Sequence, residues 1–126
     1  MKKYSILFLG LVFSVVAMCQ KPVISFEKKS YDFGKIMENA GKVTYEFEFV
    51  NTGKTPLVIN KVEASCGCTT PNWTKEPIEE GKKGKITATY NPAGRPGVFT
   101  KTVTVFSNAG EEPERLIIKG EVITSK

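Results

Sequence analysis

Histidine is absent from this chain, and aspartate and cysteine are scarce. The 126 residues include no histidine, one aspartate (Asp32) and three cysteines. Without an imidazole, Ser-His-Asp and Cys-His catalysis are excluded, because both need one to activate the nucleophile. Zinc and copper sites that use a histidine ligand are excluded for the same reason. The sequence therefore predicts a protein that is not an enzyme and holds no cofactor.

Charged residues give no positive sign of hydrolysis or of nucleic-acid binding. The adjacent glutamates, Glu79-Glu80 and Glu111-Glu112, lie beside Gly or Pro, where neighbouring carboxylates usually face water. The formal net charge is +5, but the lysines and arginines are scattered along the chain. Nucleic-acid binding needs a concentrated basic stripe with stacking aromatic residues. We therefore expect a solvated surface and no nucleic-acid partner.

The N-terminus has the three parts of a secretory signal. Lysines near the start precede an apolar stretch at residues 6–16, which is shorter than the ~20 residues of a membrane span. Ala17 and Cys19 then supply small residues before a cut ahead of Gln20. This order predicts a cleaved signal peptide over residues 1–19.

A lipid anchor is the alternative interpretation of the same segment. Cys19 would become the acylated first residue, and Val16 and Ala17 suit a lipobox, but Met18 stands where Gly, Ala or Ser is expected. Simple cleavage is favoured. Either way, residues 20–126 are expected to form one exported domain without a transmembrane span, in the periplasm or at the cell surface.

The mature chain shows strand patterns and no helical ones. No stretch of ten or more residues has apolar spacing of helical period. Short β-branched and aromatic runs alternate instead with Gly, Pro and Asn turns. Strands are expected at residues 23–28, 42–50, 57–64, 85–90, 98–107 and 115–124. The expected core consists of Val43, Tyr45, Phe47, Phe49, Ile59, Ile86, Phe99, Val103, Val105, Leu116 and Ile118.

These strands predict an all-β fold, an Ig-like antiparallel β-sandwich of about seven strands. Both sheets are expected to be antiparallel, because parallel strands would need crossover helices. Gly34 predicts a bend or strand switch, and Val62, which is out of phase with Ile59, predicts a bulge. Residues 65–77, which contain two prolines and two cysteines, are expected to be irregular.

Several segments carry a resemblance to a known family. They are Tyr31-Asp32-Phe33-Gly34, Phe49-Val50-Asn51-Thr52-Gly53, Pro56-Leu57-Val58-Ile59, Ser65-Cys66-Gly67-Cys68-Thr69, Gly97-Val98-Phe99, Ser107-Asn108 and Leu116-Ile117-Ile118-Lys119-Gly120. In this order they resemble the bacterial family called domain of unknown function 1573. That family is itself similar to Hydin-type and major-sperm-protein Ig-like domains. The resemblance covers nearly the whole mature chain and implies an exported Ig-like sandwich without an assigned activity.

Cys66 and Cys68 have three interpretations. An oxidising compartment favours a disulfide, although Cα atoms two residues apart in an extended chain lie ~7 Å from each other, so Gly67 must allow a turn. So short a bond would be easily reduced, which permits a redox role, but redox catalysts usually place Cys-x-x-Cys at a helix N-terminus. Two thiolates also suit copper or zinc, with Met37 as the one mature methionine that could assist.

The expected function follows from the fold class. The leading hypothesis is a non-enzymatic module that binds an unknown protein or glycan partner, or that joins an assembly, in the cell envelope. The alternative is thiol-dependent redox or soft-metal (copper or zinc) handling through the Cys-Gly-Cys loop. Ser65, Thr69 and Trp73 flank the disulfide candidates and form the expected ligand surface. The glycosylation triplet Asn72-Trp73-Thr74 is interpreted as a chance match.

Overall fold

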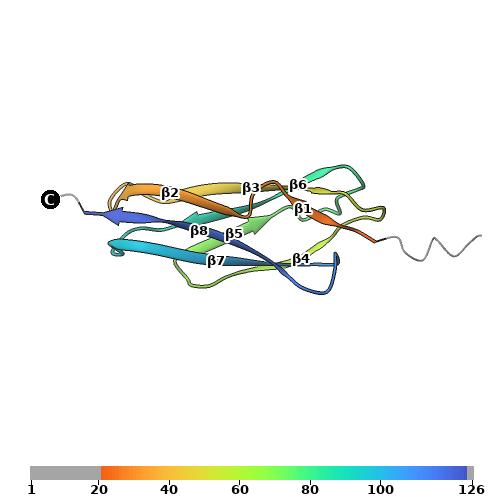
Figure 1. Ribbon diagram of the computed structural model, residues 1–126. Coiled ribbons are helices and arrows are strands. Elements are labelled where there is room, and N and C mark those ends of the chain that lie inside the picture. Colours follow the sequence, from red (N-terminus) through yellow and green to blue (C-terminus); the bar gives the residue numbers. More distant parts are fainter. Residues whose placement is uncertain (1–20, 125–126) are drawn as a thin grey trace, which may run out of the picture.

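The structure is a computed structural model that describes residues 21–124, and these residues form two packed β-sheets (Figure 1). The first sheet has the order β1 (Ile24–Phe26), β3 (Val43–Asn51), β6 (Lys83–Tyr90) and β5 (Thr69–Trp73). The second has the order β2 (Ser30–Met37), β8 (Glu114–Ile123), β7 (Gly97–Ser107) and β4 (Ile59–Ala64). The all-β sandwich is confirmed, with eight strands. The predicted signal peptide and Cys19 lie outside the described residues.

Alternating side chains explain why β3 and β6 form the centre of the first sheet. Phe47 and Phe49 are each 1% exposed, whereas Glu46 and Glu48 between them face solvent. Phe47 lies in register with Ile86 of β6, which is fully buried. The period of two therefore directs one face of this pair into the core.

One strand pair corrects the expectation of purely antiparallel sheets. β2 runs parallel to β8, from Ser30 opposite Ile117 to Met37 opposite Ile123. No crossover helix is needed, because the chain forms five strands in both sheets between β2 and β8. The long excursion through the sandwich itself replaces the helical connection.

Both irregularities that the sequence predicts are present. The β2–β8 register shifts between Asp32 and Lys35, and Gly34 there has φ +74°, with its N–H donating to Asp32 Oδ1 at 2.8 Å. The β4–β7 register shifts after Ile59, and the next inward residue, Val62, is buried. Each bulge allows an out-of-phase apolar side chain to reach the core.

The core matches most of the expected set. Of the eleven residues expected there, all but Val43 and Tyr45 are buried. Tyr45 is half-buried and stacks on Tyr31 with ring centroids 3.8 Å apart. The core also includes residues beyond that set: Leu57, Val62, Cys68, Ile78, Ala88, Tyr90 and Val122.

The stretch expected to be irregular contains a strand. β5 pairs antiparallel with β6, and Pro71 lies within it, opposite Ala88. Backbone N–H groups along an antiparallel strand point alternately toward and away from the neighbouring strand. Thr74 N donates to Lys85 O, so the N–H at position 74 points toward β6 and one at position 71 would point away from it. Because β5 is an edge strand, the missing N–H of proline breaks no bond of the ladder.

A buried asparagine ties the N-terminal segment to the sandwich. The Asn51 side chain is fully buried, and its Nδ2 donates to Thr55 O at 2.8 Å and to Ile78 O at 2.9 Å. Its Oδ1 accepts from Val23 N at 3.2 Å and Gly53 N at 2.9 Å. Every polar atom of this amide therefore has a partner, as buried polar groups require.

Candidate functional site

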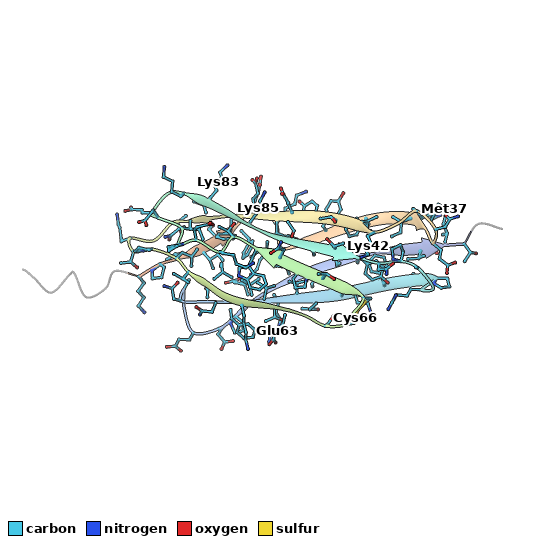
Figure 2. The ribbon with its side chains drawn as sticks, turned by 180° about the vertical axis from the view of Figure 1, so that it is seen from behind. Met37, Lys42, Glu63, Cys66, Lys83 and Lys85 are labelled. Atoms are coloured by element: carbon cyan, nitrogen blue, oxygen red, sulfur yellow. A yellow bond between two sulfur atoms is a disulfide. The ribbon has the colours of Figure 1, made fainter. Side chains whose placement is uncertain are left out.

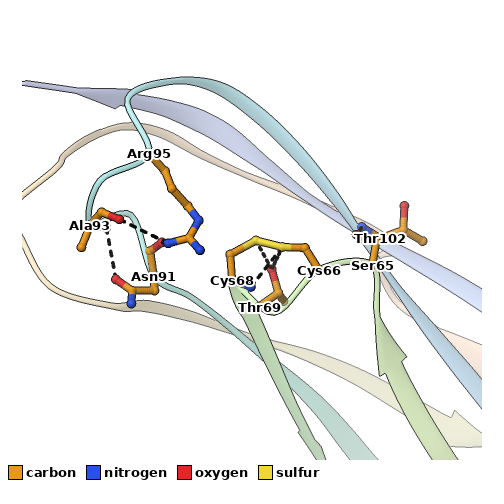
Figure 3. Close-up of a disulfide and its surroundings, with 8 residues drawn as sticks. All are labelled: Ser65, Cys66, Cys68, Thr69, Asn91, Ala93, Arg95 and Thr102. Atoms are coloured by element: carbon orange, nitrogen blue, oxygen red, sulfur yellow. Dashed lines mark hydrogen bonds between the residues drawn. A yellow bond between two sulfur atoms is a disulfide. The ribbon is translucent and has the colours of Figure 1, made fainter.

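The two cysteines lie on the connection between β4 and β5, where the chain passes from one sheet to the other (Figure 3). Their sulfur atoms are in direct contact as a disulfide, and their Cα atoms are 5.3 Å apart, within the usual range for such a bond. The N–H of Thr69 donates to Cys66 O at 3.3 Å and closes the turn. The φ of Gly67 lies outside the left-handed region, so the turn does not depend on glycine there.

The two sulfur atoms have different surroundings. Cys68 is 5% exposed and belongs to the core, whereas Cys66 is half-buried at the rim. The backbone N–H of Cys68 donates to Cys66 Sγ at 3.1 Å. The hydroxyl of Thr69, itself buried, lies 3.8 Å from Cys68 Sγ and 4.0 Å from Cys66 Sγ. Cys66 is therefore the more exposed of the two residues and Cys68 the buried one, and the Thr69 hydroxyl lies close to both sulfurs.

The connection between β6 and β7 braces the loop and brings a cation to it. Asn91 N donates to Cys68 O at 3.0 Å, and Arg95 Nη1 donates to Asn91 O at 3.5 Å and Ala93 O at 3.2 Å (Figure 3). Burial raises the pKa of the neighbouring Tyr90 phenol, and the charge of Arg95 partly opposes that rise. Arg95 therefore carries a positive charge close to the Tyr90 phenol.

The structure does not bring the expected ligand surface together. Thr69 is 3% exposed, and the Ser65 hydroxyl accepts the Thr102 N–H at 3.1 Å, so both side chains serve the fold. Trp73 lies at the far end of β5, about 13 Å from Thr69 at strand spacing. It is half-buried, with Lys75 Nζ 4.4 Å from its ring centroid. The sequence placed these residues close together because it missed the strand between them.

Metal ligands do not gather at the pair. Within residues 21–124 there is no group of three or more His, Cys, Asp or Glu side chains that could hold a metal ion. Met37, the methionine that the sequence offered as a helper, lies at the tip of the sandwich, apart from Cys66 (Figure 2). Residues 21–124 also include no helix long and apolar enough to cross a membrane.

The β4 edge is the second region with functional potential, and the sequence predicted a strand there but no functional residue on it. β4 pairs with β7 alone in the described part of the chain, and Ser65 N donates to Thr102 O at 2.9 Å just beyond its end. In antiparallel pairing the direction of the backbone groups alternates. The groups of Glu63 therefore face β7, whereas those of Val62 and Ala64 face outward from the edge.

The other three edges are less suited to pairing with a further strand. β1 has three residues, β5 contains Pro71, and β2 is interrupted by its bulge at Gly34. On β4, residues 61–64 run without a break in register. Lys61 and Glu63 form an ion pair at 3.1 Å on the outer face, and Lys61 Nζ lies 4.9 Å from the Phe106 ring centroid.

A shallow hollow lies elsewhere on the same sheet, beside β2. It has a volume of about 290 Å³ and is bordered by Asp32, Lys35, Lys119 and Glu121, which carry charges of both signs. Val98 at its rim is 80% exposed. This hollow is a separate surface that variants can distinguish from the β4 edge.

The two sheets and their strand order define an Ig-like β-sandwich. A comparison of the sequence with family models then identifies the family. Residues 24–122 match the model of the family described as protein of unknown function (DUF1573), and the chain belongs to that family. The resemblance stated from the motifs is confirmed. No curated protein matches the chain in sequence.

Solved structures share the fold at low sequence identity. A protein of unknown function from Porphyromonas gingivalis W83 is 18% identical with a TM-score of 0.71, over 81% of this chain and 47% of that one. The secreted serine protease VesC from Vibrio cholerae is 12% identical with a TM-score of 0.58, over 79% and 23%. A family 123 glycoside hydrolase from Clostridium perfringens is 8% identical with a TM-score of 0.63, over 83% and 27%. The chain thus spans about half or less of each, and these likenesses show the fold alone.

The cysteine pair should contribute little to global stability. Closing so short a loop removes little freedom from the unfolded chain, so Cys66→Ser/Cys68→Ser should lower the free energy of unfolding by less than about 2 kcal/mol. Thiol counting on freshly purified protein should find neither cysteine free. Two free thiols there, or a loss of stability well above this limit, would contradict the assignment of a local disulfide.

Proposed function

We propose that this protein is an exported, non-enzymatic module that binds an extended segment of a cell-envelope protein. The observation that carries the proposal is the edge of β4, where the backbone donors and acceptors of Val62 and Ala64 have no strand partner among residues 21–124. The signal-like N-terminus supports export. The same fold as part of a protease described as secreted is compatible with it.

β-Addition is the recognition mode that this edge suits best. A partner strand would continue the second sheet beyond β4, with main-chain hydrogen bonds supplying affinity. Lys61 and Glu63 project from the outer face of β4, where the partner's side chains would meet them. A protein partner fits better than a glycan, because a strand edge presents its donors and acceptors at the spacing of another backbone.

Proline at position 64 tests this mode. Ala64→Pro removes a free-edge N–H and places its ring in the path of the incoming strand, without removing a bond to β7. We expect capture of the partner from envelope extracts to fall by about tenfold or more, the effect of losing about 1.4 kcal/mol. Ala64→Ser, which keeps the N–H, should bind as the wild type does.

Two further variants locate the surface. Val98→Ser, in the hollow beside β2, should leave capture unchanged, and Cys66→Ser/Cys68→Ser should do the same. If Ala64→Pro folds and binds normally while Val98→Ser fails, the partner lies at the hollow and the β4 proposal is wrong. If only the cysteine variant fails, binding depends on the thiols instead.

A further inference from the structure

We propose that the Cys66–Cys68 disulfide is an exchange site for external thiolates, in addition to the binding function assigned to β4. The basis is the asymmetry of the pair. Cys66 is half-buried at the rim beside the exposed Gly67, whereas Cys68 is 5% exposed. Apart from the two neighbouring cysteines, no residue comes within 4 Å of the position that a Cβ would take at Gly67, so no other described part of the chain covers this side of the turn.

The exchange step is balanced without any further oxidant or reductant. The incoming thiolate attacks Cys66 Sγ, a bond forms between these two sulfurs, and the bond between Cys66 and Cys68 breaks. Cys68 leaves as a thiolate with the electron pair of the broken bond. A second thiolate on the same donor can then displace Cys66, which gives a reduced pair and an oxidised donor.

The groups around Cys68 stabilise it as the leaving thiolate. The Thr69 hydroxyl lies 3.8 Å from Cys68 Sγ and can donate to it once charge develops. Arg95 donates to Asn91 O, and Asn91 N donates to Cys68 O, so the segment that braces the Cys68 backbone also carries a guanidinium. A hydroxyl that donates to the developing thiolate offsets part of the cost of placing charge on a buried sulfur, so it should make Cys68 a faster leaving group.

The fold can accommodate the open form of the loop. Both ends of the loop are held by backbone bonds that do not involve sulfur, from Ser65 N to Thr102 O at 2.9 Å and from Asn91 N to Cys68 O at 3.0 Å. The ladder between β5 and β6 then begins at Thr69. Breaking the disulfide therefore leaves both sheets intact and changes only residues 65–68.

Single-cysteine variants of the full chain, made with Cys19→Ser so that no third thiol reacts, test the asymmetry. With Ellman's reagent, Cys66 in the Cys68→Ser variant should react at least about tenfold faster than Cys68 in the Cys66→Ser variant. In denaturant the two rates should become equal, because burial then no longer separates the thiols. Equal rates in the folded proteins, or a faster Cys68, would overturn the proposal.

Reaction of the oxidised protein with two kinds of reductant identifies the attacked sulfur and the source of the thiolate. In the Cys19→Ser chain, treatment with reduced glutathione followed by acid quenching and alkylation should place glutathione on Cys66 and the alkyl group on Cys68. Reduction by a dithiol protein with no glutathione adduct would assign the exchange to protein thiols. An adduct on Cys68, or resistance to both reductants while the protein stays folded, would refute it.

A positioning test separates chemistry from simple exposure. Thr69→Val removes the hydroxyl beside Cys68 and should slow exchange with either reductant, whereas Thr69→Ser should restore it. Exchange with these reductants is measured on the protein alone, without the partner, so a failure of the β4 proposal stays distinguishable from a failure of this one. Exchange at the wild-type rate in a folded Thr69→Val variant would contradict the role of the hydroxyl.

Discussion

Replacing Asn51 with alanine is expected to lower the free energy of unfolding by about 3–5 kcal/mol. The change removes the Nδ2 donor of the Thr55 carbonyl and one of the two donors of the Ile78 carbonyl, which keeps only the Leu57 N–H. It also removes the acceptor of the Val23 and Gly53 N–H groups. Each buried group that loses its partner costs ~1–3 kcal/mol, and urea unfolding of the purified protein measures the sum.

Asn108 provides a matched control for this prediction. Its side chain makes the same kind of bonds, accepting from Val58 N at 2.9 Å and donating to Pro56 O at 3.2 Å, but it is exposed. Water can replace those bonds, so Asn108→Ala should cost only about 1 kcal/mol. Equal losses for the two variants would mean that burial of Asn51 does not set its contribution.

Replacing Phe47 with alanine should have a comparable effect through packing. The ring is 1% exposed, lies opposite Ile86 and packs edge-on against Tyr45, with centroids 4.8 Å apart. Deleting a buried ring removes its transfer free energy and leaves a cavity, at a cost of about 3–5 kcal/mol. Chemical denaturation measures this loss. If the dependence of the unfolding free energy on denaturant concentration is unchanged, the substitution has altered stability and not the compactness of either state.

Val43 is the control for Phe47 because it begins the same strand but is half-buried. Val43→Ala should cost less than about 2 kcal/mol, since fewer apolar atoms leave a packed environment. A near-neutral Phe47→Ala, or a larger loss at Val43, would contradict the inward face assigned to β3.

Much of the fold could be predicted from the sequence because local alternation determines it. Residues 42–49 alternate strictly, and the β3 face that they predict is the buried one for Phe47 and Phe49. Gly34 and Val62 break the alternation, and the register shifts at Gly34 and, ahead of Val62, between Ile59 and Lys61. Period and phase are properties of the chain that neighbouring strands do not change.

The remaining features depend on which strands meet, which alternation does not encode. The parallel pairing of β2 with β8 joins segments separated by five other strands. The sequence around Asn51 is typical of a turn. In the structure its side chain is buried and bonds to two segments that are distant in the sequence, at Val23 and Ile78. Pro71 disfavours a strand at its position in the sequence, because proline is tolerated mainly in edge strands, and the sequence does not show that β5 is an edge.

The candidate site was predicted in part for the same reason. The proximity of Cys66 and Cys68 follows from their spacing, whereas the burial of Cys68 and the nearby Arg95 come from packing against the β6–β7 connection. The β4 edge left no signal in the sequence, because an edge is defined by the strand that is missing beside it.

Hydrogen exchange on the captured complex shows directly whether a partner strand pairs with β4. The amides of Val62 and Ala64 face outward from the edge in the free protein, so they should exchange early. With the partner bound, their exchange should slow by about tenfold or more, since a strand added beside β4 would occupy these donors. Unchanged exchange at β4, with protection appearing instead around Val98 and the hollow beside β2, would contradict the account.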